Sequence, residues 1–162
     1  MPRPDTGMPA RSAGILVFRR TAGTLEVLLG HMGGPFWARR QEAAWSAPKG
    51  LLEGAEEPLA AARREFAEET GLPVPAGELL PLGSVRASSG KTVTLWAVES
   101  DVDLGSFSPG TFPLEWPPHS GRQIEVPEID AVRWVPVDEA HTLLVRGQRP
   151  FLDRLEALLP PR

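Results

Sequence analysis

The segment from Gly50 to Leu72 constrains this chain more than any other part of its 162 residues. Its second half, PLAAARREFAEET over residues 58–70, predicts a helix built from good helix formers. Pro58 suits the first helical position, where its missing N–H costs little, and Gly71 suits the residue after the helix, where a positive φ is common. One stripe of this helix is apolar and is expected to face the core: Leu59, Ala62 and Phe66.

The same helix carries three carboxylates where they oppose its stability. Glu65, Glu68 and Glu69 stand at i, i+3 and i+4, so their side chains emerge on one face. Each close pair of like charges costs about 0.2–0.5 kcal/mol, and the last turn is the wrong end of the helix dipole for anions. A solvated acidic face with an arginine partner is the ordinary explanation of such a run. Divalent cations held among the carboxylates are the alternative, because hard cations take oxygen ligands.

The wider spacing favours the cation. Residues 50–72 match, at every fixed position, the Nudix box G-x5-E-x7-R-E-U-x-E-E-x-G-U, in which U is apolar and is filled by Phe66 and Leu72. The chain therefore resembles the Nudix hydrolases over these 23 residues. The resemblance implies a Nudix-like α/β/α sandwich with a mixed sheet, of the α/β (α+β) class. It also implies hydrolysis of a nucleoside diphosphate linked to another moiety, with Mg²⁺ or Mn²⁺ as cofactor.

The resemblance also implies roles for individual residues. Glu65, Glu68 and Glu69 become metal ligands, and a main-chain carbonyl near Lys49 completes one metal's shell. Glu56 assists catalysis from the loop, and Arg64 orients the carboxylates through a salt bridge.

Features outside the box resemble those of diadenosine tetraphosphate hydrolases. The run from Trp45 to Gly50 is similar to the W-x-x-P-K-G entry of that group, which diphosphoinositol polyphosphate phosphohydrolases share. The animal enzymes carry an extra Glu six residues before a strand Trp, and Glu128 precedes Trp134 by six. The resemblance thus makes Glu128 an off-box metal ligand or base, with Glu125 as the near alternative. Two departures concern the substrate: this chain has no Tyr for an adenine clamp, and residues 105–128 form a Pro-rich insertion.

Five further residues are candidates for substrate binding. Lys49 and Lys91 are the only lysines beside 15 arginines, and ammonium groups bind phosphate as point charges. Trp37, Arg39 and Arg40 precede Trp45 on one loop, where they can stack on a base and hold a distal phosphate. Ordinary surface lysines and a loop anchored by one aromatic side chain are the competing interpretations. The three histidines have no metal-ligand spacing, which makes them structural or exposed.

The rest of the chain predicts a mixed α/β fold with helices packed on strands. Residues 1–11 predict a flexible tail, and residues 12–162 predict a single domain. Residues 12–18 and 25–29 predict one hairpin, 79–87 and 91–99 predict another, and 129–135 predict a further strand. Helices are expected at 138–145 and 150–159, and residues 100–127 are expected to form a long loop.

Composition narrows the function further. The formal charge is 17 − 21 = −4, which argues against long nucleic acid as a partner. Cysteine is absent, which excludes disulfides and thiol nucleophiles. No apolar run approaches the roughly 20 residues of a membrane span, and the first ten residues lack the apolar core of a signal peptide. The chain is expected to be a cytoplasmic monomer or homodimer.

Taken together, the sequence predicts an enzyme that acts on a nucleotide or dinucleoside polyphosphate, most simply diadenosine tetraphosphate. A nucleoside triphosphate pyrophosphohydrolase that sanitises the nucleotide pool and a non-catalytic nucleotide sensor are the alternatives. A diphosphoinositol substrate is less favoured, because the chain shows no dense basic cluster.

Overall fold

The computed structural model of the chain describes residues 10–87 and 89–160. Its strands are β1 (Arg11–Thr21), β2 (Thr24–Met32), β3 (Trp45–Ser46), β4 (Lys49–Leu51), β5 (Leu80–Arg86), β6 (Thr92–Glu99), β7 (Thr111–Glu115), β8 (Gln123–Pro127) and β9 (Ile129–Pro136). Its helices are α1 (Pro58–Thr70), α2 (Val137–Leu143) and α3 (Pro150–Leu158), with short 3₁₀ turns η1 (Leu104–Ser106) and η2 (Arg146–Gln148). Most of the expected tail lies outside the described residues, and β1 begins at its last position.

The main sheet is mixed, as expected, and β1 is at its centre. β1 pairs antiparallel with β2 and β4 and parallel with β6, and the order along the sheet is β3-β2-β1-β6-β5. β9 joins the sheet through β2. Both predicted hairpins, β1–β2 and β5–β6, are confirmed.

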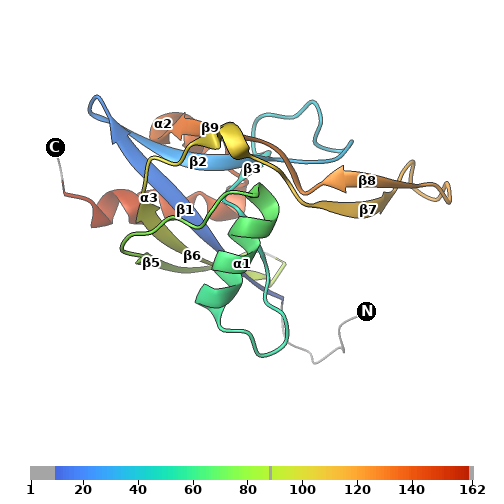
Figure 1. The fold of residues 1–162 in the computed structure, drawn as a ribbon, viewed down its shortest axis with the longest axis horizontal. Coiled ribbons are helices and arrows are strands. Elements are labelled where there is room, and N and C mark those ends of the chain that lie inside the picture. Colours follow the sequence, from blue (N-terminus) through green and yellow to red (C-terminus); the bar gives the residue numbers. More distant parts are fainter. Residues whose placement is uncertain (1–9, 88, 161–162) are drawn as a thin grey trace.

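The alternation of side chains along β1 builds two apolar layers, because successive strand residues point to opposite faces. Ile15 and Val17 pack with the α1 residues Ala62 and Phe66. The residues between them face the other way, toward α3 and α2, in a cluster that includes Leu16, Phe18, Ala140, Phe151, Leu152 and Leu155. The sheet is thus sandwiched between α1 and the α2–α3 pair (Figure 1), which confirms the α/β/α architecture.

Helix α1 has the predicted bounds, Pro58–Thr70. It ends where Gly71 takes the left-handed conformation at φ 66° and donates its N–H to the carbonyl of Ala67. Phe66 is fully buried, and the Thr70 hydroxyl donates to the Phe66 carbonyl at 2.6 Å. These contacts fix the last turn, which carries the acidic face.

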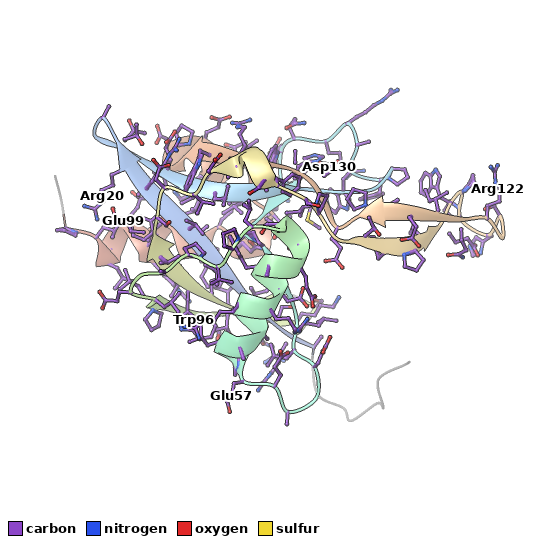
Figure 2. The ribbon with its side chains drawn as sticks, viewed as in Figure 1. Arg20, Glu57, Trp96, Glu99, Arg122 and Asp130 are labelled. Atoms are coloured by element: carbon purple, nitrogen blue, oxygen red, sulfur yellow. The ribbon has the colours of Figure 1, made fainter. Side chains whose placement is uncertain are left out.

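The prediction that residues 100–127 form a long loop was wrong. This stretch contains η1 and an antiparallel hairpin, β7–β8, in which Phe112 pairs with Val126 and Leu114 pairs with Ile124. The apolar alternation of these strands was hidden by the many prolines around it. The hairpin projects from the body of the molecule (Figure 1), with Arg122 near its tip and Asp130 near its base (Figure 2).

The remaining predicted elements are present with shifted ends. The predicted strand 129–135 is β9, and the predicted helices are α2 and α3. No helix in residues 10–87 and 89–160 is long and apolar enough to cross a membrane.

Candidate active site

A cavity of about 1020 Å³ opens where α1, β4 and the base of the hairpin meet. One part of its wall comes from β4, α1 and the residue before β6, and it includes the ionisable residues Lys49, Glu65, Glu69 and Lys91. Another part comes from the end of β2, the following loop, β7 and β9, and it carries Met32, Trp37, Phe112 and Ile129. Glu128 also lines the cavity.

Three carboxylates converge at this cavity. Glu65, Glu69 and Glu128 each offer one oxygen, and these oxygens lie within 4.8 Å of one another. Glu65 and Glu69 are one helical turn apart on α1 and only 9% and 7% exposed. Glu128 comes from the single residue between β8 and β9. Its backbone is fixed on both sides, because Gly33 donates to its carbonyl at 2.9 Å and its own N–H donates to the carbonyl of Gly110 at 3.2 Å.

In the absence of a cation, the pKa values of the two buried carboxylates, Glu65 and Glu69, are raised. Burial, together with the facing Glu128 carboxylate, raises the pKa of Glu69 to about 9, although the Lys49 backbone N–H donates to its Oε2 at 3.1 Å. Burial also raises the pKa of Glu65, and the Arg64 guanidinium opposes that shift. Buried carboxylates are costly unless positive charge is close to them. Their oxygens are also the ligands that a hard divalent ion prefers.

Arg64 connects the loop before α1 to the acidic face. Its Nε and Nη2 both donate to the Glu56 carboxylate at 2.9 Å, and its Nη1 donates to Glu65 at 2.9 Å and to Glu68 at 3.1 Å. The fork also reaches the Leu51 carbonyl at 3.1 Å. These hydrogen bonds lower the pKa of Glu56, and they raise the pKa of Arg64 itself. The planar guanidinium therefore sets the position of Glu65 relative to β4.

Gly50 is a glycine for a steric reason. A Cβ built on it would lie 2.0 Å from the Cδ of Glu65 and 2.1–2.4 Å from its two oxygens. Any side chain at this position would displace the carboxylate. The first glycine of the motif therefore makes room for its glutamate.

The other predicted metal ligands occupy different environments. Glu68 is 59% exposed at its side chain, pairs with Arg64, and lies outside the group of three converging carboxylates. Glu125 accepts a hydrogen bond from the Thr111 hydroxyl on the hairpin. Of the two off-box candidates, the structure places Glu128, not Glu125, beside Glu69.

Three of the five predicted substrate-binding residues line the cavity, and two do not. Lys49, Lys91 and Trp37 line the cavity. Arg39 is exposed, and Arg40 stacks its guanidinium 4.3 Å from the ring centroid of Phe36; neither arginine lines the cavity. A role in binding substrate stays a prediction for all five.

His31 joins two segments of the fold. It is buried, its Nδ1 lies 2.8 Å from Asp130 Oδ1, and its Nε2 lies 2.6 Å from the carbonyl of Arg40. These bonds tie the loop that bears Trp37 to β9.

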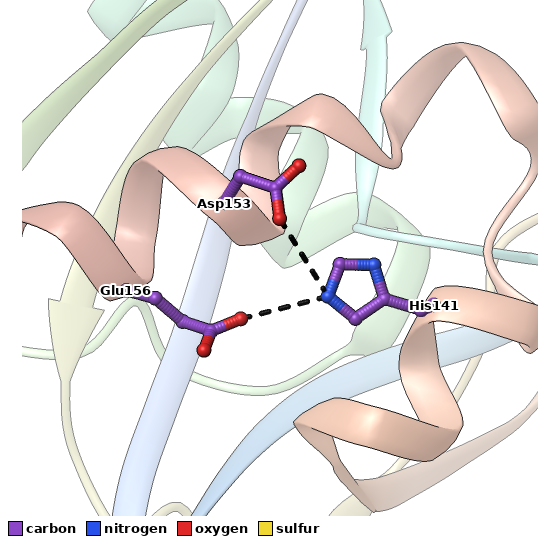
Figure 3. Close-up of side chains that lie close together, drawn as sticks. All are labelled: His141, Asp153 and Glu156. Carbon is purple, nitrogen blue, oxygen red and sulfur yellow. Dashed lines mark ion pairs between the residues drawn. The ribbon is translucent and has the colours of Figure 1, made fainter.

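A second group of potential ligand atoms lies between α2 and α3 (Figure 3). His141 Nε2 lies 3.8 Å from Asp153 Oδ1 and 3.5 Å from Glu156 Oε1, and all three side chains are more than one third exposed. None of them lines the cavity. When the imidazole is protonated, these contacts are ion pairs that link the two helices.

Sequence reasoning missed Phe112, Met32 and Ile129 at the cavity. The alternation in Thr111–Glu115 and Gln123–Pro127 was the available signal for Phe112, and Pro113 within the first strand obscured it. The register of β2 against β9, which pairs Met32 with Ile129, has no signal in the sequence alone.

Known proteins resemble this chain over most of its length. The model of the NUDIX domain family matches residues 8–155. An RNA pyrophosphohydrolase from Rhodospirillum rubrum is 29% identical over 168 residues, covering 95% of this chain and 94% of that protein.

Solved structures share the fold at low identity. The Ap4A hydrolase of C. elegans, in a binary complex, superimposes with a TM-score of 0.60 at 21% identity, covering 91% of this chain and 96% of that one. The NUDIX domain of Shewanella oneidensis NrtR, complexed with ADP ribose, gives a TM-score of 0.62 at 17% identity, covering 94% of this chain and 89% of that one.

Proposed function

Because the chain belongs to the NUDIX family of hydrolases, we propose that it is a Mg²⁺-dependent pyrophosphohydrolase whose substrate is a dinucleoside polyphosphate such as diadenosine tetraphosphate. One observation carries the proposal. Glu65, Glu69 and Glu128 converge within 4.8 Å at a cavity that two lysines also line. The carboxylates and two lysines therefore line the same cavity.

Glu65, Glu69 and Glu128 are the residues that would hold the cation. They fit such an ion because all their donors are oxygens, two of the three are buried, and the pKa of Glu69 is raised to about 9 without one. A divalent ion, Mg²⁺ or Mn²⁺, supplies Lewis-acid stabilisation of phosphate charge and increases the acidity of water. Glu68, on the exposed rim of the same helix face, is a further candidate ligand.

The chain's own residues supply binding and orientation. The Lys49 and Lys91 ammonium groups bind the polyphosphate as point charges. Arg64 holds the Glu65 carboxylate through a 2.9 Å hydrogen bond while Glu56 holds Arg64. Glu128 is the exposed member of the cluster, and we assign its carboxylate as the base that accepts the proton of the attacking water. Much of the remaining rate enhancement in phosphoryl chemistry comes from positioning.

Two features support the dinucleoside polyphosphate. The entry to the site, Trp45 to Gly50, is the W-x-x-P-K-G run found in that group, and it places Lys49 at the cavity. The cavity, at about 1020 Å³, is at the upper end of the roughly 300–1,000 Å³ of typical ligand pockets. It is thus larger than a lone phosphate group requires.

A second candidate substrate is the 5′-triphosphate end of an RNA, and the named Rhodospirillum rubrum relative favours it. The formal charge of −4 argues against grip on a long RNA backbone, so recognition would be confined to the terminal nucleotides. A free nucleoside triphosphate is the third substrate to compare. A non-catalytic sensor is disfavoured because every glutamate of the box is present.

The test is turnover of a panel of diadenosine tetraphosphate, nucleoside triphosphates and a short 5′-triphosphate RNA, with Mg²⁺ or Mn²⁺. We expect ATP and AMP from diadenosine tetraphosphate, and we expect it to give the highest kcat/KM. Glu128→Gln should abolish turnover, while Glu125→Gln, three residues away on the exposed hairpin, should keep it. A higher kcat/KM on RNA ends or triphosphates would replace the substrate assignment. Release of no product from any of the three would overturn the proposal as a whole.

A further inference from the structure

The β7–β8 hairpin brings an aromatic ring to the cavity, and this ring does not pack in the core. Phe112 is only partly buried, and it belongs to neither of the two apolar clusters that pack against the faces of the sheet. It does line the cavity. Trp37, on the loop after β2, lines the same cavity but also packs against the core. Trp37 is therefore held by the core, whereas Phe112 lies on the projecting hairpin.

The apolar face of the hairpin is continuous with this wall. Phe112 and Leu114 on β7 pair with Val126 and Ile124 on β8, so all four side chains share one face. A Cβ at Gly34, three residues before Trp37, would lie 3.9 Å from both Leu114 and Val126. This face therefore lies against the loop that carries Trp37.

Phe112 is also close to the carboxylates through the chain itself. Phe112 pairs with Val126, which is two residues before Glu128. Two strand residues span about 6.6 Å and paired strands lie about 4.8 Å apart, so the backbones of Phe112 and Glu128 are roughly 8 Å apart, a distance that one nucleotide can span. A planar base against Phe112 is thus compatible with a phosphate at the glutamate cluster.

We propose that the nucleobase of the substrate stacks on Phe112, on the side of the cavity that Trp37 also lines, so that the β7–β8 hairpin is the base-recognition element of this enzyme. The proposal rests on the proposed function for the nucleotide class of the substrate. It adds a specificity-determining residue to that function. Because Glu128 follows the hairpin directly, base recognition and the placement of a catalytic carboxylate come from one element of the fold.

Calorimetric binding of AMP and of ribose 5-phosphate to the full chain in Mg²⁺ tests the proposal. Neither ligand has an anhydride bond, so the result does not depend on turnover. Base–aromatic stacking is strong enough that Phe112→Ala should weaken AMP binding at least about fivefold. The same change should leave ribose 5-phosphate binding within about twofold, and Phe112→Tyr should restore AMP binding.

The matched control is Ile124→Ala, which shortens an exposed side chain on the same face of the hairpin but outside the cavity. It should bind both ligands as the wild type does. Equal wild-type affinity for AMP and ribose 5-phosphate would overturn the proposal, as would unchanged AMP binding in Phe112→Ala. A protein that prefers AMP through Phe112 yet hydrolyses no substrate would keep this inference and remove the proposed function.

Discussion

Glu69→Gln is the substitution whose effect the structure predicts most specifically, because it should stabilise the metal-free protein. The wild-type side chain is 7% exposed and faces Glu128, and these two features together raise the pKa of its carboxyl group to about 9. The group therefore stays protonated in the folded protein at neutral pH. In the unfolded chain the same group ionises near 4.5. Glutamine keeps an oxygen to accept the Lys49 N–H and adds an N–H₂ that can donate to Glu128.

The magnitude follows from linkage. Below pH 4.5 the carboxyl is protonated in both states and contributes nothing to the pH dependence. Above it, ionisation favours the unfolded chain by about 1.4 kcal/mol per pH unit, which gives an upper limit of about 4 kcal/mol at pH 7.5. Because the fold relaxes around the buried carboxylate when it ionises, we expect about half of that limit, or about 2 kcal/mol. That free energy corresponds to a rise of about 4–8 °C in Tm for a chain of this size.

Thermal unfolding in EDTA between pH 5 and pH 8 measures this effect. The advantage of Glu69→Gln over the wild type should grow steadily across that range. Added Mg²⁺ should raise the wild-type Tm and have little effect on the variant, because the variant lacks one carboxylate ligand. Glu68→Gln is the control, since its side chain is 59% exposed, and it should change stability by less than about 0.5 kcal/mol. A Glu69→Gln protein that is less stable than the wild type in EDTA, or a difference that does not vary with pH, would refute the reasoning.

Three further predictions concern the same site. Arg64→Lys should lower kcat about 10–100-fold with the fold intact, because an ammonium group cannot reproduce the paired hydrogen bonds to Glu56; steady-state kinetics beside a circular dichroism spectrum checks this, and a wild-type kcat would contradict it. Gly50→Ala should cost roughly 100-fold in kcat/KM, because its Cβ would lie 2.0 Å from the Glu65 Cδ; full activity in the same assay would show that this contact is unimportant. Binding of Mg²⁺ at pH 7.5 should release close to one proton, because Glu69 has a pKa of about 9 in the free protein; calorimetry in buffers of different ionisation enthalpy measures this, and identical heats in all buffers would exclude it.

The parts of the fold that local sequence determines were predictable. The bounds of α1 follow from Pro58 and Gly71, which act within one helical turn, and the hairpins follow from short turns between apolar runs. The α/β/α arrangement followed from the resemblance carried by residues 50–72. The β7–β8 hairpin was not predicted, because Pro113 and the prolines beyond Glu115 weaken the strand pattern although the alternation of apolar residues is present.

The site also contains a part that local sequence determines and a part that depends on long-range contacts. Helical spacing brings Glu65 and Glu69 together, and it does so within a few residues of sequence. The position of Glu128 beside them depends on backbone hydrogen bonds to Gly33 and Gly110, which are distant in the chain. The spacing to Trp134 therefore favoured Glu128 but kept Glu125 as the near alternative. Phe112 reaches the cavity only through the hairpin that the sequence concealed. The positions of Glu128 and Phe112 depend on contacts between segments that are distant in the chain, which is why they could not be predicted from local sequence alone.

The most direct test of the central claim is the product analysis of diadenosine tetraphosphate incubated with the protein and Mg²⁺, for the wild type, Glu128→Gln and Glu125→Gln. We predict ATP and AMP in equal amounts from the wild type and from Glu125→Gln, with none from Glu128→Gln. Equal turnover by all three proteins would contradict the role of the carboxylate cluster, and intact substrate in all three would contradict the substrate that we propose.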